Sequence, residues 1–404
     1  MLRAKQLFWY AIGPALGVLS PLLAVPIVLM RFGSEGWATI AIGQSVGAVC
    51  LILVEMGWGL SGPQRVSRAT ESLRKQLFAA GATSKLTLML IVSVPMCLIA
   101  EGLAGAHRLA AASAAMGLAS TGLAPGWFLT GLGRPRDILL SEGLPRMAAT
   151  LVASVAMFFD GPLVTFGLAQ LAAGLLATPI AASRLGIRRY LIPPRTAFAG
   201  AQENLSSIGL RLTSAVYVAL PTTLLAHSAP PLVAGFAAVD RLMRMELVFL
   251  QVVPLSLQRE FGSCPESEVA RRGIRLVMLN LAVGVIGAAA FAGVFPIVFP
   301  IAFAGELWVG PLSVLAAAGV ILVCSVSRAT GSLWLVRRGG IRWIWASAAL
   351  GAVAVWPALS SLSREHGVPG AIAALLMVEI LVLVVQCVGI LLVERVSAQR
   401  VVEA

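Results

Sequence analysis

Charged residues are scarce in this sequence. Only 12% of its 404 residues are Asp, Glu, Lys or Arg, whereas a soluble domain carries about 25%. Histidine and tyrosine are also scarce, with three of each, while 58% of the residues are hydrophobic. This balance excludes a soluble enzyme, a disordered chain and a collagen-like chain. What remains is a membrane protein, whose few polar residues can be considered one at a time.

Cysteine is the next shortage. The five cysteines make an odd number, none forms a CxxC pair, and four of them lie inside apolar runs. A disulfide framework or a zinc site is therefore not expected. The phosphate-loop pattern GxxxxGK[ST], the metalloprotease pattern HExxH and the hydrolase pattern GxSxG are absent as well. We expect no enzyme, no resident cofactor and no metal.

Long apolar runs are what the chain has in abundance. A helix needs about 20 apolar residues to cross the hydrocarbon core of a bilayer. We predict an all-α polytopic membrane protein with twelve spans. They cover residues 8–30, 37–59, 86–104, 110–132, 144–160, 164–183, 203–226, 232–254, 276–298, 309–333, 343–360 and 370–392.

Basic residues alternate between the loops that join these spans. Loops on the side of the termini hold 22 Lys and Arg, with Lys85 counted in the loop over residues 60–85. The opposite loops hold three, which are Arg31, Arg108 and Arg364. The positive-inside rule therefore predicts that both termini are cytoplasmic. Because the net charge of +12 is divided among many short loops, no nucleic-acid partner is expected.

Tryptophans recur near the ends of the predicted spans. An indole ring prefers the boundary between lipid and water, so these residues are predicted to anchor the helices there. They are Trp9, Trp37, Trp58, Trp308, Trp334 and Trp343.

The layout repeats once along the chain. The longest predicted cytoplasmic loops, 60–85 and 255–275, follow the second and the eighth span, and a short basic turn follows the fourth and the tenth. Matching loops indicate a parallel duplication. We predict an N-terminal lobe over 1–195 with spans one to six and a C-terminal lobe over 196–404 with spans seven to twelve.

We single out nine of the charged residues that fall inside predicted spans, where each charge costs at least a few kcal/mol. The arginines are Arg146, Arg211, Arg241, Arg244 and Arg328, and the acids are Glu55, Asp240, Glu246 and Glu379. The structural explanation is local pairing, as between Asp240 and Arg244, or side chains that reach the membrane surface, as from Arg146 and Arg211.

The functional explanation is a polar cavity lined by guanidinium groups. Arginine stays charged, and its planar fork matches phosphate oxygens with two hydrogen bonds, so such a cavity suits an anionic headgroup. The four acids are then candidates to bind H⁺ or Na⁺ for coupling. Both explanations remain open at the level of the sequence.

Four stretches carry a resemblance to a known family. They are the prolines of the first span with Arg31–Trp37, the end of the second span at Glu55–Trp58, the end of the fourth span at Pro125–Gly131, and Asp240–Arg244 in the eighth span. Together these stretches resemble the Wzx-type polysaccharide flippases of the multidrug/oligosaccharidyl-lipid/polysaccharide (MOP) transporter superfamily.

The resemblance implies two six-helix lobes and alternating access through a cationic cavity. The implied substrate is an undecaprenyl-pyrophosphate-linked oligosaccharide, which is flipped from the cytoplasmic to the outer leaflet of the bacterial plasma membrane. Its headgroup would meet the five arginines of the predicted spans. The implied partners are this lipid-linked oligosaccharide, the bilayer, and other membrane proteins of polysaccharide assembly.

Two alternatives remain. A multidrug exporter of the same superfamily would carry cations, for which five arginines against four acids are a poor match. A polysaccharide polymerase is a weaker alternative, because such enzymes need a large outer loop with ionisable residues. The longest outer loop here, Phe299–Trp308, contains only Glu306.

Overall fold

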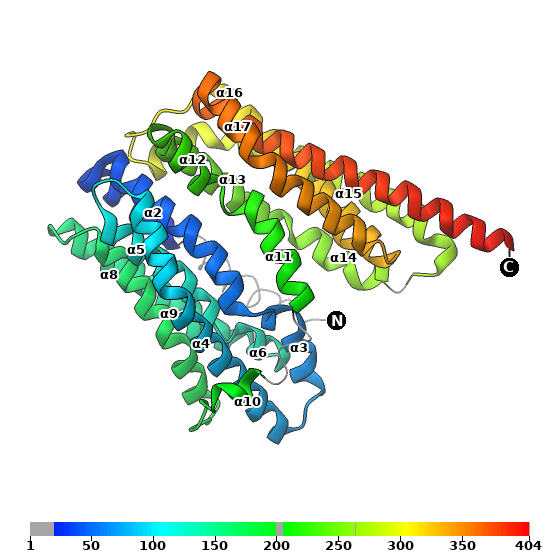
Figure 1. The fold of residues 1–404 in the computed structure, drawn as a ribbon, viewed down its shortest axis with the longest axis horizontal. Coiled ribbons are helices and arrows are strands. Elements are labelled where there is room, and N and C mark those ends of the chain that lie inside the picture. The colour runs from blue at the N-terminus through cyan, green and yellow to red at the C-terminus, as the bar shows by residue number, and fades with distance from the viewer. Residues whose placement is uncertain (1–19, 199–204, 263, 404) are drawn as a thin grey trace. The chain divides into compact units, whose positions relative to one another are not determined.

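Helices are the only regular elements in the part of the chain that the computed structural model describes, which is residues 20–198, 205–262 and 264–403 (Figure 1). The predicted all-α fold is confirmed.

Seven helical stretches are long and apolar enough to cross a membrane. They are η1–α2 (Ser20–Glu55), α4 (Glu71–Leu103), α7–α8 (Pro135–Phe158), α9 (Val164–Arg184), η6–α15 (Glu266–Ala302), α16–η7 (Pro311–Leu335) and most of α17 (Ile341–Arg395). The chain is a multi-pass membrane protein.

Two of these stretches contain a reversal of the chain at a glycine. Gly33 interrupts α2 (Val25–Glu55) with φ 64° and ψ −169°, and Gly367 interrupts α17 (Ile341–Glu403) with φ 62° and ψ −138°. Residues with a Cβ almost never adopt these angles. Figure 1 shows α17 folding back on itself, orange and then red. Each of the two helices therefore contains parts of two predicted spans.

Shorter helices occupy most of the other predicted spans. They are α5 (Arg108–Ala119), α11 (Leu205–Val218), α12 (Pro221–Ser228) and α13 (Val233–Leu250). The helix α13 has only 18 residues, and four of them are charged, so it is not among the seven stretches that are apolar enough to cross a membrane. The number of twelve spans stays a prediction.

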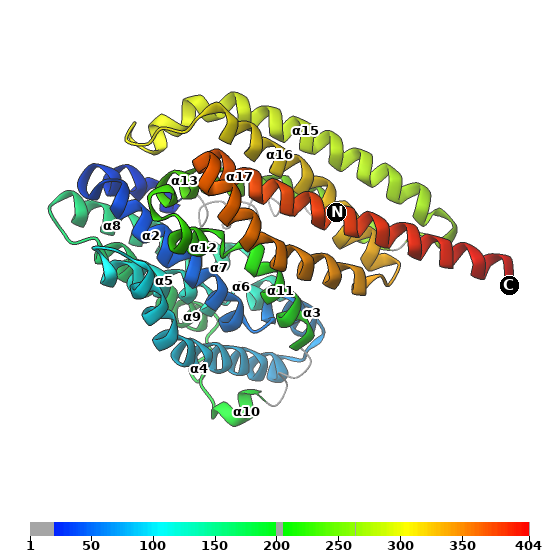
Figure 2. The same ribbon diagram turned by 45° about the horizontal axis from the view of Figure 1, so that its top comes forward.

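The chain divides into two compact units. Unit 1 comprises Met1–Ala215 and Ala302–Glu306, and unit 2 comprises Val216–Ile301 and Leu307–Ala404. In unit 1, α5 packs against α2, α4 and α9, and α8 packs on α9 (Figures 1 and 2). In unit 2, α17 packs against α16 and α12, and α16 packs against α13. The predicted lobes, 1–195 and 196–404, stay a prediction.

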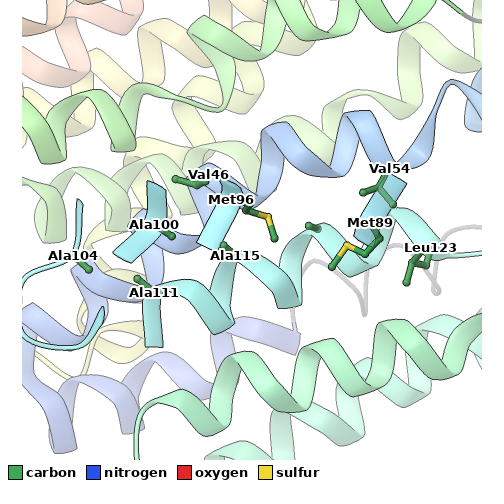
Figure 3. Close-up of a cluster of buried hydrophobic side chains, with 10 residues drawn as sticks. Val46, Val54, Met89, Met96, Ala100, Ala104, Ala111, Ala115 and Leu123 are labelled. Atoms are coloured by element: carbon green, nitrogen blue, oxygen red, sulfur yellow. The ribbon is translucent and has the colours of Figure 1, made fainter. Parts of the chain in front are cut away.

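Small residues bring the helices of unit 1 close together. A Cβ at Gly43 or Gly47 of α2 would collide with the backbone of Ala111 or Ala115 of α5. Figure 3 shows the apolar cluster around this crossing, in which Met96 and other side chains of α4 join the alanines. Close backbone approach maximises van der Waals contact, which holds helices together where lipid competes for apolar surface.

The predicted loop over residues 60–85 is wrong. This stretch forms α3 (Trp58–Arg68) and the first half of α4, so Lys85 lies within a helix. The polar residues at the start of α4 are compatible with a helix because Glu71 and Lys75 pair one turn apart, at 2.9 Å. The second predicted loop, 255–275, is likewise helical over much of its length, in α14 (Val252–Gly262) and the start of α15 (Val269–Ala302).

Three of the tryptophans predicted at the membrane boundary pack inside the protein and not against lipid. Trp37, Trp58 and Trp334 are buried inside the protein, whereas Trp308 is 86% exposed. The buried indoles find partners there, since Trp58 donates to Ser84 and Trp334 donates to Glu394. Trp9 lies outside the described residues.

Candidate substrate site

A lysine lies buried in unit 1. Lys85 of α4 is 2% exposed, and its Nζ donates a hydrogen bond of 2.9 Å to the carbonyl oxygen of Ala124. The carboxyl groups of Glu55 and Glu142 lie close enough to interact with it electrostatically. An ammonium group without such partners would be strongly unfavourable at this depth.

Two indoles and two cations form a stack around this lysine. The Lys85 Nζ lies 5.6 Å from the ring centre of Trp127, which lies 4.6 Å from that of Trp58, and the Arg65 guanidinium covers Trp58 at 5.4 Å. Cations over aromatic faces are stabilised by the ring quadrupole. The Trp127 ring also lies against Gly62 and Gly81, where any Cβ would collide with it. The stack is therefore held in one position.

Glu142 and Arg146 extend the group on the next helix. Glu142 belongs to a π-helical turn, η3 (Leu139–Gly143), that leads into α8 (Leu144–Phe158), and it interacts electrostatically with both Arg146 and Lys85. In the described part of the chain its buried Oε1 has no hydrogen-bond partner. We name this set the N-terminal cluster. It consists of Glu55, Trp58, Arg65, Lys85, Trp127, Glu142 and Arg146.

The sequence predicted only two members of this cluster, Glu55 and Arg146. Lys85 and Glu142 were placed in loops because a charged residue next to an apolar run marks the end of a predicted span. Proximity along the chain gives no signal either, since Lys85 and its carbonyl partner are 39 residues apart.

A second charged group lies within unit 2. Asp240 and Arg244, one turn apart on α13, form an ion pair of 2.8 Å, as their spacing predicted. Arg241 follows Asp240 directly and interacts with its charge. On α16 (Pro311–Arg328), Arg328 donates a hydrogen bond of 2.6 Å to the carbonyl oxygen of Leu247. That carbonyl is in the last turn of α13, where the helix dipole favours a cation.

Glu379 of α17 completes this group. It interacts with the charges of Arg244 and Arg328, and its carboxyl also contacts Cys324 of α16. We name Asp240, Arg241, Arg244, Arg328 and Glu379 the C-terminal cluster. Three guanidinium groups and two carboxyl groups thus come together from α13, α16 and α17.

Two predicted site residues remain to be considered. Glu246 of α13 lies against Gly287 of α15, at 3.2 Å from the position that a Cβ on this glycine would take. Arg211 belongs to α11, but its side chain lies outside the described residues. The roles of all nine predicted residues stay predictions.

Each unit also has an ionic group at a helix end. In unit 1, Arg134 and Arg184 pair with Asp137 at 3.3 and 2.7 Å. In unit 2, Arg338 makes two hydrogen bonds of 2.7 Å to Glu394 and also pairs with Glu266. Burial lowers the pKa of Arg338, but these carboxylates outweigh it and raise the pKa above its usual value. These residues tie helix ends together.

Solved structures of other proteins are similar to this chain in fold. No family model and no curated protein sequence matches the chain. An inward-facing multidrug resistance transporter of the MATE family and MOP superfamily superposes with a TM-score of 0.72 at 16% identity, covering 99% of this chain and 100% of that one. The lipid II flippase MurJ, in an inward closed conformation, superposes with a TM-score of 0.69 at 8% identity, covering 94% and 86%.

A third similar structure is a MOP superfamily transporter from Pyrococcus furiosus Vc1. Its TM-score is 0.54 at 14% identity, with 98% of this chain and 96% of that one covered. It is described as having a binding pocket of reversed polarity that suggests a different function. At these identities the similarity shows the fold, which is that of MOP superfamily transporters.

Proposed function

We propose that the protein is a transporter that moves a lipid-linked oligosaccharide from the cytoplasmic to the outer leaflet of the bacterial plasma membrane by alternating access. The observation that carries this proposal is the composition of the C-terminal cluster, in which three guanidinium groups face two carboxyl groups. An excess of fixed positive charge in an apolar unit favours an anionic ligand. A pyrophosphate linkage has that charge, and its oxygens fit the arginine fork.

The charge balance also separates the two functions found among proteins of this fold. Similar structures include multidrug transporters and a lipid II flippase. An exporter of organic cations would need a carboxylate excess at its binding residues, because a site with a net positive charge repels a cation. The arginines of α13 and α16 therefore favour the flippase.

The N-terminal cluster is proposed to couple transport to an ion. It combines three cations with two carboxyl groups, and the buried Oε1 of Glu142 has no hydrogen-bond partner in the described part of the chain. Such an oxygen can accept a proton or contact Na⁺. Glu55 of this cluster, and Asp240 and Glu379 of the C-terminal cluster, are the other carboxyl candidates, together with Glu246.

The first experiment deletes the gene, extracts lipid-linked saccharides and stains surface polysaccharide. Complete lipid-linked repeat units accumulating inside the cell, with surface glycan lost, would support the flippase and identify its glycan. Normal glycan with changed drug susceptibility would favour the multidrug exporter instead. Glycan arrested at a single unit on the outer leaflet would favour the polymerase.

The second experiment removes single charges from the C-terminal cluster. We expect Arg241→Ala and Arg328→Ala to abolish surface polysaccharide at normal membrane abundance. Arg328→Lys should restore it only in part, because an ammonium group lacks the two-pronged geometry. Arg364→Ala, at an exposed arginine of α17, is the matched control and should behave as wild type. Wild-type output from both cluster variants would refute the role of these arginines.

A further inference from the structure

A pocket opens in unit 2, and its lining includes no residue of either charged cluster. It has a volume of about 410 Å³ and lies between α14 and the first turns of α15. Pockets of roughly 300–1,000 Å³ are the size that binds small molecules and headgroups. Its lining combines Arg271, Arg272 and Arg275 with the apolar Leu257, Phe261 and Leu276.

The three arginines leave this pocket positively charged. Glu268 pairs with Arg272 at 2.6 Å and with Arg271 at 3.6 Å, so one carboxylate holds two guanidinium groups side by side. Arg275, one turn further along α15, is exposed, and no carboxylate pairs with it in the described part of the chain. Among the lining residues that the structure describes, three cations stand against one anion, which makes the pocket complementary to a phosphate group.

The exposed surface of α15 changes from charged to apolar near Arg275. Arg275 is the last charged residue of the helix, which ends at Ala302. Ile274, Met278 and Leu279 are exposed beside or beyond it, and exposed apolar side chains continue to Ile301. An apolar helix surface that begins at a group of arginines marks the boundary between headgroups and hydrocarbon.

We propose that this pocket binds a diacyl phospholipid with an anionic headgroup, such as phosphatidylglycerol. The phosphate is held by Arg271, Arg272 and Arg275, and the acyl chains lie along the exposed apolar face of α15. A water-soluble phosphate compound would use the arginines but not the adjoining face that leads into the hydrocarbon. The site lies on the side predicted to be cytoplasmic, and it does not depend on the proposed transport function.

Lipid binding to the purified full-length protein tests this site. Native mass spectrometry in detergent would compare phosphatidylglycerol with the zwitterionic phosphatidylcholine. We expect selective retention of phosphatidylglycerol that weakens as ionic strength rises. Each arginine near the surface contributes about 1 kcal/mol to anionic lipid binding. Arg275→Ala should therefore reduce affinity about fivefold, and the double variant Arg271→Ala/Arg275→Ala about 25-fold.

The control is Arg188→Ala, at an exposed arginine of unit 1 on the same predicted side. It should bind phosphatidylglycerol as wild type does, and all variants should keep the wild-type melting temperature because the substituted side chains are exposed. Equal retention of the two lipids, or unchanged binding by the double variant, would overturn the site. Glycerol 1-phosphate binding as tightly as the lipid would overturn the assignment to a phospholipid. A polysaccharide defect in the double variant is not required, so this test is separate from that of transport.

Discussion

The two charged clusters stabilise buried charge in different ways. The N-terminal cluster places one ammonium group against an indole and a carbonyl oxygen, with carboxyl groups supplied from α2 and η3. In the C-terminal cluster all the cations are arginines, and its closest ion pair is local to α13. A compact ammonium group can be enclosed completely, whereas a guanidinium group with five donors seldom finds all its partners inside a protein. We infer that the first cluster is the more rigid and the second the more available to a ligand.

The largest effect is expected from removing the enclosed ammonium group. Lys85→Met keeps the shape of the side chain but leaves the carboxyl groups beside it without their cation. Breaking a buried pair by removing one partner costs about 3–5 kcal/mol. We expect a large loss of thermal stability, measured by fluorescence-detected gel filtration of heated detergent extracts.

The matched control is Lys75→Met on the same helix, where the lysine side chain is 57% exposed. It should change stability little, because an exposed ion pair contributes at most about 1 kcal/mol. If Lys85→Met were as stable as the control, the difference between the two clusters would disappear.

A smaller effect is expected from the local pair in the C-terminal cluster. Asp240→Asn removes the partner of Arg244, which keeps its interaction with Glu379. The loss of a hydrogen bond between charged groups costs about 1.5–3 kcal/mol. Thermal stability should therefore fall less than in Lys85→Met, and an equal or greater fall would reverse the proposed ranking of the clusters.

Alanine substitutions at two glycines would show how tightly a tryptophan is packed in each unit. A Cβ at Gly81 would collide with Trp127, and a Cβ at Gly273 would approach Trp334 to 2.6 Å. Overpacking of this kind costs about 1–3 kcal/mol. Gly81→Ala should lower the melting temperature more than Gly273→Ala, because Trp127 is also confined by Gly62.

The controls for this comparison are glycines at which a Cβ would meet no other atom. Gly102 of α4 and Gly293 of α15 have nothing within 4 Å of the position of a Cβ. Alanine at either one should leave the melting temperature unchanged or raise it, since alanine favours helix by about 1 kcal/mol over glycine. Equal melting temperatures for Gly81→Ala and Gly102→Ala would contradict the tight packing of Trp127.

The smallest effect is expected at the exposed ionic group of unit 1. The Arg134 side chain is 49% exposed, and Asp137 retains Arg184 when Arg134 is replaced. Arg134→Ala should destabilise the protein by less than about 1 kcal/mol, and high salt should abolish the effect. Arg338→Ala should cost more and respond less to salt, because that side chain is 7% exposed. Melting curves of the two variants at low and high salt measure the loss of stability and its dependence on salt.

What the sequence could predict depended on how far apart the interacting residues lie. The pair of Asp240 and Arg244 followed from a spacing of one helical turn, and it is present. The partners of Arg328 and Lys85 are carbonyl groups 81 and 39 residues away, so no local pattern indicates them. Apolar runs located most helices, but they misplaced Lys85, whose burial depends on Trp127 and two distant carboxyl groups.

The reversals at Gly33 and Gly367 require glycine because of the sign of its φ angle more than because of its small size. A Cβ at Gly33 would have nothing within 4 Å, and one at Gly367 would meet only Leu232 at 3.9 Å. Space is therefore available at both, and the constraint is the sign of φ. The mirror images of their dihedral angles fall in the extended polyproline region that L-residues prefer. A D-alanine would adopt these dihedral angles without backbone strain, while an L-alanine would cost about 1–3 kcal/mol. At these two positions the backbone therefore favours a residue of one chirality over its enantiomer.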